Sequence, residues 1–342
     1  MQYKRVVITR FGGPEVLALV EDELPEPLPG QARIRILAAG VAYADVGMRL
    51  GTYPSQRTGP PPFSPGYDIV GIVDKVGAEV TSVRPGERVA ALTTVGGYAE
   101  YLCLAASELV QTPAAADPAQ AVSLVLNYMT AYQMLHRVAE VKSGDTILVH
   151  GAAGGVGTAF LQLGKLAGLK MIGTASSRKQ GLVEKLGATP IDYRAGDWVE
   201  PVRALTNGGA DSAYDPIGAD NFQKSYRALR PGGLLVTYGN YVASQGGQVD
   251  PRAITASRPT IEQLKQQGAD GRCVASYFIG GMKEAHPDWF RSDLAALMEL
   301  LAQKGISPVV AERLPLAEAR RAHELLDRAA VSGKIVLIPN LV

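Results

Sequence analysis

The chain has few of the residues on which several common chemistries depend. It has two cysteines, Cys103 and Cys273, and four histidines among 342 residues. Two cysteines cannot build a disulfide framework, and they do not form a Cys-x-x-Cys pair. No histidine stands at short ligand spacing from another histidine or from a cysteine. We therefore expect neither a disulfide-stabilised secreted domain nor a metal site, and the cysteine content suits the reducing cytoplasm.

Excess charge and long apolar runs are also missing. The formal net charge is +1, which gives no electrostatic reason to expect a nucleic acid or an anionic membrane as partner. No apolar run reaches the roughly 18 to 20 residues that are needed to cross a bilayer. Residues 1–13 hold only a short apolar stretch and predict a strand rather than a secretory signal. We expect a cytoplasmic protein with no nucleic-acid or membrane partner.

The length and composition predict an ordinary globular protein of two domains. Of the 342 residues, 46% are hydrophobic and 20% are charged. The first 110 or so residues are β-rich, with alternating or short apolar segments at 32–41, 67–77 and 86–92 that predict strands. Asp117-Pro118 then predicts the start of a helix, because Asp caps a helix N-terminus and Pro suits the first helical position.

Strands and helices alternate from residue 145 onward. Strands are predicted at 145–151, 169–176, 189–194, 210–218 and 234–240, with a helix after each of the first four. Repeated strand–helix–strand units of this size predict a parallel sheet with helices on both faces. The remaining chain from about 275 predicts two helices and a last strand at 334–339.

Residues 241–275 fit this alternation least well. They are rich in Gly, Gln and basic residues and are longer than an ordinary connection. We expect either a flap or subunit contact near a substrate entrance, or simply a solvated loop.

The turn His150-Gly-Ala-Ala-Gly-Gly-Val-Gly-Thr158 carries the strongest functional signal. It follows a buried apolar strand and opens a helix, which is the context of a dinucleotide-binding turn. Gly154 allows the backbone to approach a pyrophosphate, and Gly157 allows the helix to pack against its strand. The N–H groups and the positive dipole end of the helix would hold the phosphates. The alternative is a tight strand-to-helix turn that binds no ligand.

The segment after the second predicted strand indicates which dinucleotide is bound. Proteins that bind NAD have a carboxylate there for the ribose 2′-hydroxyl, whereas residues 174–179 read Thr-Ala-Ser-Ser-Arg-Lys. Two hydroxyls and two cations suit a 2′-phosphate and hence NADP(H). Tyr193, at the end of the third predicted strand, would lie along the same edge of the sheet. The alternative is an exposed helix start with ordinary surface cations.

The order of motifs resembles a known family. The chain is similar, over essentially its whole length, to zinc-independent members of the medium-chain dehydrogenase/reductase superfamily, in the quinone oxidoreductase and enoyl reductase branch. The segments that carry the resemblance are 6–21, 38–54, 62–77, 96–101, 124–135, 144–168, 229–240 and 332–339. The resemblance implies an α/β fold with a GroES-like β-rich catalytic domain (1–120 and 275–342) and a Rossmann, doubly wound parallel-sheet domain that binds NADP (121–274). It also implies a homodimer.

The same resemblance implies the reaction. Zinc-dependent relatives carry a catalytic Cys and a Gly-His-Glu motif where this chain has Ala42-Tyr43-Ala44-Asp45 and Gly66-Tyr67-Asp68. The family pattern therefore predicts NADPH-dependent, zinc-independent hydride transfer to a small-molecule quinone or α,β-unsaturated carbonyl. Ala42 stands where quinone reductases usually have Asn, which leaves general enone reduction open. Two alternatives remain: a metal-free ketone or alcohol oxidoreductase, and a non-catalytic NADPH-binding sensor or structural protein.

The resemblance also assigns residues to the site. It implies that the pyrophosphate is held by Gly154, Gly155 and Val156, and the 2′-phosphate by Ser176, Lys179 and Tyr193. Asn127 and Thr130 would lie near the nicotinamide. Gly239 and Asn240, after the fifth strand, and Phe278, in the late segment that closes over the cofactor, are also implied cofactor-binding residues. Tyr53 corresponds to an aromatic residue at the substrate mouth and is the implied catalytic group.

Several of these residues have simpler interpretations. Asn127 could satisfy a local backbone group, and Tyr53 could be core packing. Asp45 is expected to hold a local hydrogen bond rather than to act as an acid. Lys334 is expected either to reach a cofactor phosphate or to lie on solvated surface.

Overall fold

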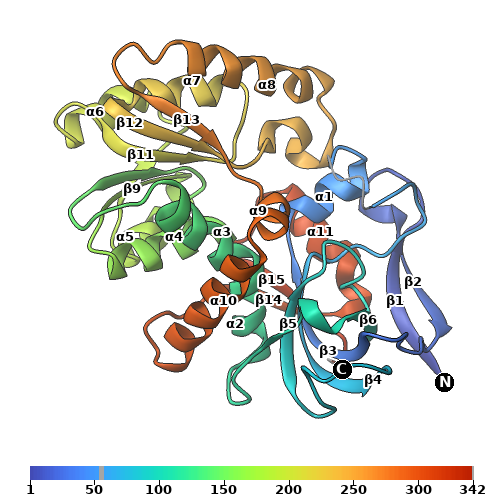
Figure 1. Ribbon diagram of the computed structural model, residues 1–342. Coiled ribbons are helices and arrows are strands. Elements are labelled where there is room, and N and C mark those ends of the chain that lie inside the picture. Colours follow the sequence, from blue (N-terminus) through green and yellow to red (C-terminus); the bar gives the residue numbers. More distant parts are fainter. Residues whose placement is uncertain (54–57, 341–342) are drawn as a thin grey trace. The chain divides into compact units, whose positions relative to one another are not determined.

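The computed structural model describes residues 1–53 and 58–340 (Figure 1). The chain forms two compact units, one of residues 1–126, 246–248 and 287–342, and one of residues 127–245 and 249–286. These limits differ by several residues from the expected division at 120/121 and 274/275. The first difference arises because one helical segment, 118–138, runs through that boundary without a break. The second arises because residues 273–276 form a strand of the second unit's sheet.

The first unit is built around a mostly antiparallel sheet of seven strands. The strand order is β14-β15-β3-β4-β5-β7, and β6 pairs with β3 at the amino-terminal end of that strand. The strands are β3 (Gln31–Val41), β4 (Asp68–Val76), β5 (Arg88–Leu92), β6 (Tyr101–Ala105), β7 (Val110–Gln111), β14 (Val310–Pro315) and β15 (Lys334–Ile338). A separate antiparallel pair is formed by β1 (Gln2–Ile8) and β2 (Leu17–Glu23). Because β15 pairs with β3, segments about 300 residues apart in sequence complete one sheet.

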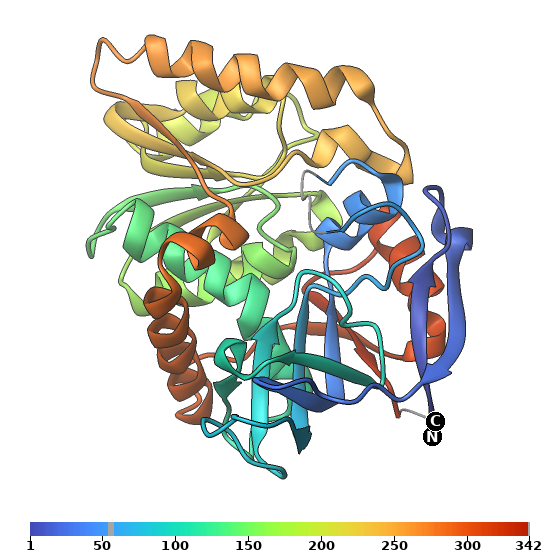
Figure 2. The same cartoon turned by 45° about the vertical axis from the view of Figure 1, so that its right-hand side comes forward.

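The first unit also contains helices. They are α1 (Tyr43–Leu50), α2 (Pro118–Ser123), α10 (Pro287–Ala302) and α11 (Ala319–Asp327), with short 3-10 turns at Pro14–Val16, Ala106–Glu108 and Leu316–Glu318. α1 and α11 lie side by side (Figures 1 and 2). Over the first 110 or so residues the sequence predicted only strands, so α1 was missed. Its eight residues include a glycine, and its amino-terminal turn depends on the buried side chain of Asp45.

The second unit contains the predicted doubly wound parallel sheet. All six strands are parallel, in the order β10-β9-β8-β11-β12-β13. They are β8 (Thr146–Val149), β9 (Lys170–Ala175), β10 (Thr189–Asp192), β11 (Ala210–Asp215), β12 (Leu229–Thr237) and β13 (Cys273–Ser276). The order reverses between β8 and β11, which is the point where such sheets bind ligands at the carboxyl ends of their strands. The expected fold class is confirmed.

Helices lie on both faces of this sheet. They are α4 (Gly155–Leu166), α5 (Gln180–Lys185), α6 (Val199–Leu205), α7 (Asp220–Arg227) and α8 (Pro251–Gln266), and a further helix, α9 (Ile279–Ala285), follows β13. Apolar residues of α6, α7 and α8 form one buried cluster with Leu148, Ala213 and Leu235 of the central strands. Right-handed crossovers place α4 and α5 on the opposite face. α7 and α8 run side by side over the sheet (Figure 1).

The segment 241–275 is another regular strand–helix–strand unit. After a 3-10 turn at Tyr241–Gly247 it forms α8 and then β13. Asp250 caps α8, since its carboxylate accepts hydrogen bonds from the N–H groups of Arg252 and Ala253. The segment is therefore not a solvated loop, and its role as a flap or subunit contact stays a prediction. Pro259 inside the helix and the Gly- and Gln-rich flanks hid the helical pattern.

The helical segment 118–138 changes its winding twice. Ordinary α-helical turns, α2 and α3 (Met129–Gln133), alternate with π-helical turns at Leu124–Tyr128 and Met134–Val138. Such π-turns are rare and often occur at functional sites. Asn127 lies within the first of them, so its direction does not follow from a regular helical repeat.

Candidate functional site

The glycine-rich turn has the geometry of a phosphate-binding loop. β8 ends at Val149, and Gly154 is the N-cap of α4. The turn is closed by a hydrogen bond from the N–H of Gly154 to the carbonyl of Gly151, at 2.8 Å. A Cβ atom at Gly157 would lie 2.2 Å from that same carbonyl oxygen, so only glycine allows this approach of helix and turn. The first residues of α4, Gly155 and Val156, present N–H groups that have no partner within the helix.

Asn127 lies directly against this turn. Its side-chain nitrogen would be 2.0 Å from a Cβ placed on Gly155, and Asn127 is 6% exposed. The glycine at position 155 therefore makes room for the amide of Asn127. Thr130, further along the same helical segment, is 5% exposed. The structure thus brings Asn127 and Gly155 together, and the π-turn rather than a simple helical repeat sets the direction of Asn127.

A group of cations stands at the ends of β9 and β10. These strands are neighbours, with Ala175 opposite Asp192, so Ser176 and Tyr193 follow at the same edge of the sheet. Lys179 is half-buried just after Ser176. Burial lowers the pKa of Lys179, and the positive charges of Arg178 and Arg194 lower it further.

Sequence reasoning missed Arg194 as a member of this group. Its guanidinium carbon lies 5.5 Å from the centre of the Tyr193 ring. The signal was available, because Arg194 follows Tyr193 at the end of a predicted strand. Three cations that repel one another form a site that an anion with two negative charges would stabilise.

The ends of β12 and β13 carry the remaining predicted residues. A Cβ at Gly239 would lie 2.8 Å from the carbonyl oxygen of Pro216, so a glycine is needed where two loops meet. The amide nitrogen of Asn240 donates to the carbonyl of Ala253 in α8, at 3.1 Å. Asn240 therefore ties its loop to α8, and its side-chain oxygen is buried without a hydrogen-bond partner in the described part of the chain. Phe278, just before α9, is 49% exposed.

A buried polar network that the sequence did not predict supports this edge. His150 Nδ1 lies 2.9 Å from Thr174 Oγ1, and His150 Nε2 lies 3.0 Å from Ser225 Oγ. Ser225 donates its proton to Asp215 at 2.6 Å, so it accepts a proton from Nε2, and Nδ1 in turn accepts from Thr174. Burial lowers the pKa of His150, which keeps the ring neutral. The network links the ends of β8, β9 and β11 to α7.

The first unit contains the predicted catalytic residue, Tyr53. The hydroxyl oxygens of Tyr53 and Tyr67 are 2.5 Å apart. The two rings meet edge to face, with their centres 6.0 Å apart. Tyr53 is partly exposed and Tyr67 is 1% exposed, so Tyr53 presents a hydrogen-bonded hydroxyl rather than only an apolar ring.

Asp45 has the local role that the sequence suggested. Its carboxylate accepts hydrogen bonds from the N–H of Ala42 at 2.8 Å and from the N–H of Gly66 at 3.1 Å. The hydroxyl of Tyr98 also donates to it at 3.2 Å and lies 3.3 Å from His323 Nε2. Burial raises the pKa of Asp45 to about 7. Because Asp45 is fully buried, it positions the backbone and does not reach a substrate.

Lys334 lies in a buried ion pair. Its Nζ is 3.0 and 3.2 Å from the two carboxylate oxygens of Asp68, and the side chains are 2% and 0% exposed. Burial raises the pKa of Asp68, and the charge of Lys334 opposes that shift. Both sequence interpretations of Lys334, a phosphate contact and a solvated surface residue, were wrong. The pair connects the start of β15 to the start of β4, and β3 lies between these two strands.

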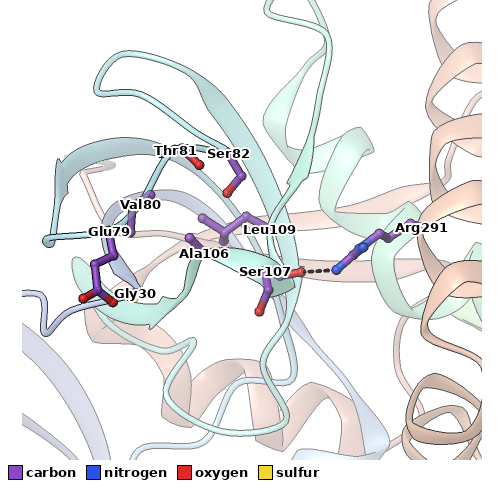
Figure 3. Close-up of a pocket in the computed structure, with 9 residues that line it drawn as sticks. All are labelled: Gly30, Glu79, Val80, Thr81, Ser82, Ala106, Ser107, Leu109 and Arg291. Carbon is purple, nitrogen blue, oxygen red and sulfur yellow. Dashed lines mark hydrogen bonds between the residues drawn. The ribbon is translucent and has the colours of Figure 1, made fainter.

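Metal sites, membrane-spanning helices and cavities add no further candidate. Among residues 1–53 and 58–340, no group of three or more His, Cys, Asp or Glu side chains could hold a metal ion. Within the same residues, no helix is both long and apolar enough to cross a membrane. An open pocket of about 500 Å³ lies on the first unit, where Arg291 donates to the carbonyl of Ser107 at 2.8 Å (Figure 3). None of the predicted site residues lines it.

Comparison with known proteins agrees with these observations. Residues 28–114 match the alcohol dehydrogenase GroES-like domain family, and residues 186–337 match the zinc-binding dehydrogenase family. The chain is 31% identical to the synaptic vesicle membrane protein VAT-1 homolog of Danio rerio, over 98% of this chain and 70% of that protein. It is 33% identical to the 2-haloacrylate reductase of a Burkholderia species, over 98% of both.

The structural comparison covers the whole fold. The structure of Escherichia coli quinone oxidoreductase complexed with NADPH is 31% identical in sequence and matches with a TM-score of 0.87. That match covers 98% of this chain and 100% of the other. The GroES-like unit, the parallel-sheet unit and these relatives agree with one another. The chain belongs to the medium-chain dehydrogenase/reductase superfamily, in its zinc-independent quinone oxidoreductase and enoyl reductase branch.

Proposed function

We propose that this protein is an NADPH-dependent oxidoreductase that transfers hydride, without zinc, to a quinone or to the C=C bond of an α,β-unsaturated carbonyl compound. The observation that carries the proposal is the group of Lys179, Arg178 and Arg194 at the same sheet edge as the glycine-rich turn. One relative is named a 2-haloacrylate reductase, and a quinone oxidoreductase of the same fold is complexed with NADPH.

The residues at the sheet edge fit the parts of NADPH. The N–H groups of Gly154, Gly155 and Val156 would hold the pyrophosphate, because the glycine turn leaves no side chains in the way. Ser176, Lys179, Tyr193 and Arg194 would hold the 2′-phosphate. Asn127, Thr130, Gly239, Asn240 and Phe278 would border the nicotinamide, which supplies a hydride when bound.

Tyr53 is proposed to complete the reaction. Addition of hydride to a conjugated acceptor leaves negative charge on the conjugated oxygen and the α-carbon. The phenolic hydroxyl of Tyr53 can donate a hydrogen bond to that charge and then give up its proton. Water returns the proton to Tyr53. A quinone accepts one hydride and one proton in the same way and leaves as the hydroquinone.

The assembly is proposed to be a cytoplasmic homodimer. β13 is the last strand of the parallel sheet, and among the described residues it pairs only with β12. A second copy could extend the sheet along that edge. Both cysteines are free, as a reducing compartment requires. Light scattering on the purified protein would test the dimer, and a monomer at micromolar concentration would refute it.

One panel of acceptors tests the function. We expect oxidation of NADPH, followed by its absorbance, with 1,4-benzoquinones, short enones, 2-haloacrylates or enoyl thioesters, and no oxidation with simple ketones. Turnover of ketones alone would favour the metal-free ketone or alcohol oxidoreductase. Tight NADPH binding without turnover of any acceptor would favour the sensor or structural protein. Either result would overturn the proposal.

A further inference from the structure

The proposed proton donor, Tyr53, has a buried tyrosine as its partner. A separation of 2.5 Å between two hydroxyl oxygens is a short hydrogen bond, in which one hydroxyl donates and the other accepts. Tyr53 is the more exposed of the two, so it is the residue that can meet a substrate. Within this bond, Tyr53 keeps its proton for transfer only if Tyr67 donates to it and not the reverse.

The backbone around Tyr67 is tightly held. The carbonyl of Tyr67 accepts hydrogen bonds from the N–H groups of Thr93 and Thr94, at 2.8 and 3.2 Å. The carbonyl of Gly66, the preceding residue, accepts a hydrogen bond from Thr93 Oγ1 at 2.7 Å. A Cβ at Gly66 would lie 2.5 Å from the backbone nitrogen of Tyr98, and φ at Gly66 is +110°. Only glycine fits there, and the direction of Tyr67 is fixed as a result.

Buried carboxylates fix the residues on both sides of Tyr67. On one side, Asp45 accepts the N–H of Gly66. On the other, Asp68 forms the buried ion pair with Lys334 at the start of β4. Tyr53, by contrast, follows the end of α1 and is held through its N–H by the carbonyl of Gly47 at 3.2 Å. The rigid member of the pair is therefore Tyr67, and the accessible member is Tyr53.

We propose that Tyr67 is a positioning residue for proton transfer: its hydroxyl donates to the oxygen of Tyr53, orients the Tyr53 proton and stabilises the phenolate that proton transfer leaves. In the step itself, the O–H bond of Tyr53 breaks and a C–H or O–H bond forms on the reduced acceptor. The electron pair stays on the Tyr53 oxygen, and Tyr67 keeps its own proton. The kinetic part of this inference depends on the proposed function, whereas the hydrogen bond does not.

Kinetics provide the first test. Tyr67→Phe removes one hydrogen bond to a developing charge, so kcat with an enone is expected to fall roughly tenfold to a hundredfold, with the KM for NADPH unchanged. Tyr53→Phe is expected to lower kcat at least as far. The double variant should match Tyr53→Phe, because Tyr67 acts only through Tyr53. Tyr3→Phe, on β1 and outside the site, is the matched control and should keep wild-type kinetics.

The proposal would be overturned if each single variant lowered kcat and the double variant lowered it by the product of the two separate factors. A Tyr67→Phe enzyme with wild-type kcat would overturn it too. The pH profile separates positioning from general damage, because loss of the Tyr67 donor should move the alkaline limb of the kcat profile to higher pH. An unshifted limb with a lower plateau would indicate only a packing role and would also overturn it.

Nuclear magnetic resonance tests the hydrogen bond without any substrate. In protein labelled at the tyrosine Cζ carbons, the Tyr53 signal is assigned by its loss in Tyr53→Phe. We expect that signal to titrate at higher pH in Tyr67→Phe than in the wild type. A low-field hydroxyl proton signal that disappears in Tyr53→Phe would establish the bond even if Tyr67→Phe did not fold. Absence of both effects would overturn the inference, while failure of every acceptor in the wild type would refute only the proposed function.

Discussion

Replacing Lys179 with alanine should change the choice between NADPH and NADH. Lys179 is half-buried, and burial together with the charges of Arg178 and Arg194 lowers its pKa. Without ligand, the positive charges of Arg178 and Arg194 disfavour the charge of Lys179. A 2′-phosphate bound between the cations would favour it. NADH has no phosphate at that position.

The size of the effect follows from the kind of contact. A hydrogen bond to a charged group contributes about 1.5 to 3 kcal/mol, which corresponds to roughly 10-fold to 150-fold in affinity. Lys179 is partly exposed, so water and salt screen part of its charge and favour the lower half of this range. We therefore expect the Kd for NADPH to rise roughly 10-fold to 50-fold in Lys179→Ala. The Kd for NADH should change by less than about twofold, because only the phosphate contact is lost.

Fluorescence titration with each nucleotide measures both constants on the same protein. Lys185→Ala is the matched control, since Lys185 is an exposed cation in the last turn of α5. In the wild type, the Kd for NADH divided by the Kd for NADPH should also fall with added salt, because salt screens the phosphate contact. In Lys179→Ala this ratio should fall much less. Equal losses for NADPH and NADH would refute the placement of the phosphate site.

Four further predictions follow from contacts in the two units. Gly157→Ala should abolish nucleotide binding by titration, because its Cβ would lie 2.2 Å from the carbonyl oxygen of Gly151; an alanine variant that binds normally would contradict the geometry of the turn. Asp327→Asn should lower the thermal midpoint by roughly 6 to 20 °C, because it leaves the fully buried Arg49 without its carboxylate partner; a midpoint within a degree or two of the wild type would show that the pair contributes little. Burial lowers the pKa of His323 to about 3, against about 6.5 in an unfolded chain. In acid, unfolding therefore takes up a proton at this residue. Its contribution to stability is lost as the pH falls from about 6.5 toward 3. His323→Gln should therefore show a smaller drop in thermal midpoint between about pH 7 and pH 5, and an unchanged drop would mean that another group controls it. Chelation with EDTA should leave the rate of NADPH oxidation unchanged, whereas loss of activity restored by zinc would overturn the zinc-independent mechanism.

The parts of the fold that depend on local pattern could be predicted from the sequence. Apolar runs such as Ile147-Leu148-Val149, followed by a glycine turn, are typical of a buried parallel strand and the helix after it, and the structure has both. The preference for NADP(H) was likewise inferred from one short segment, residues 174–179, which has no carboxylate after β9. The sheet edge that is proposed to bind the cofactor could be located from the sequence because its parts lie at the ends of elements that can each be recognised alone.

The parts that the sequence did not predict depend on partners far apart in the chain. Lys334 and Asp68 are 266 positions apart, so nothing in either neighbourhood indicates that both are buried. The role of the Tyr67 hydroxyl depends on its hydrogen bond with Tyr53, 2.5 Å away, and the sequence around Tyr67 does not indicate that bond. α8 was missed for a different reason: Pro259 and its polar residues disfavour a helix locally, and packing on α7 and β13 stabilises it nonetheless.

Because the first unit is formed by separate parts of the chain, its sheet can be completed only late in synthesis on the ribosome. Residues 1–126 emerge first, but β15, which completes their sheet beside β3, is translated some 200 residues later. Until then Asp68 has no lysine to neutralise it, and β3 has one open edge along its carboxyl half. The parallel-sheet unit is nearly continuous in sequence and can fold in the interval. The nascent amino-terminal part must therefore wait in a partly exposed state, where a chaperone that shields strand edges would have its greatest effect.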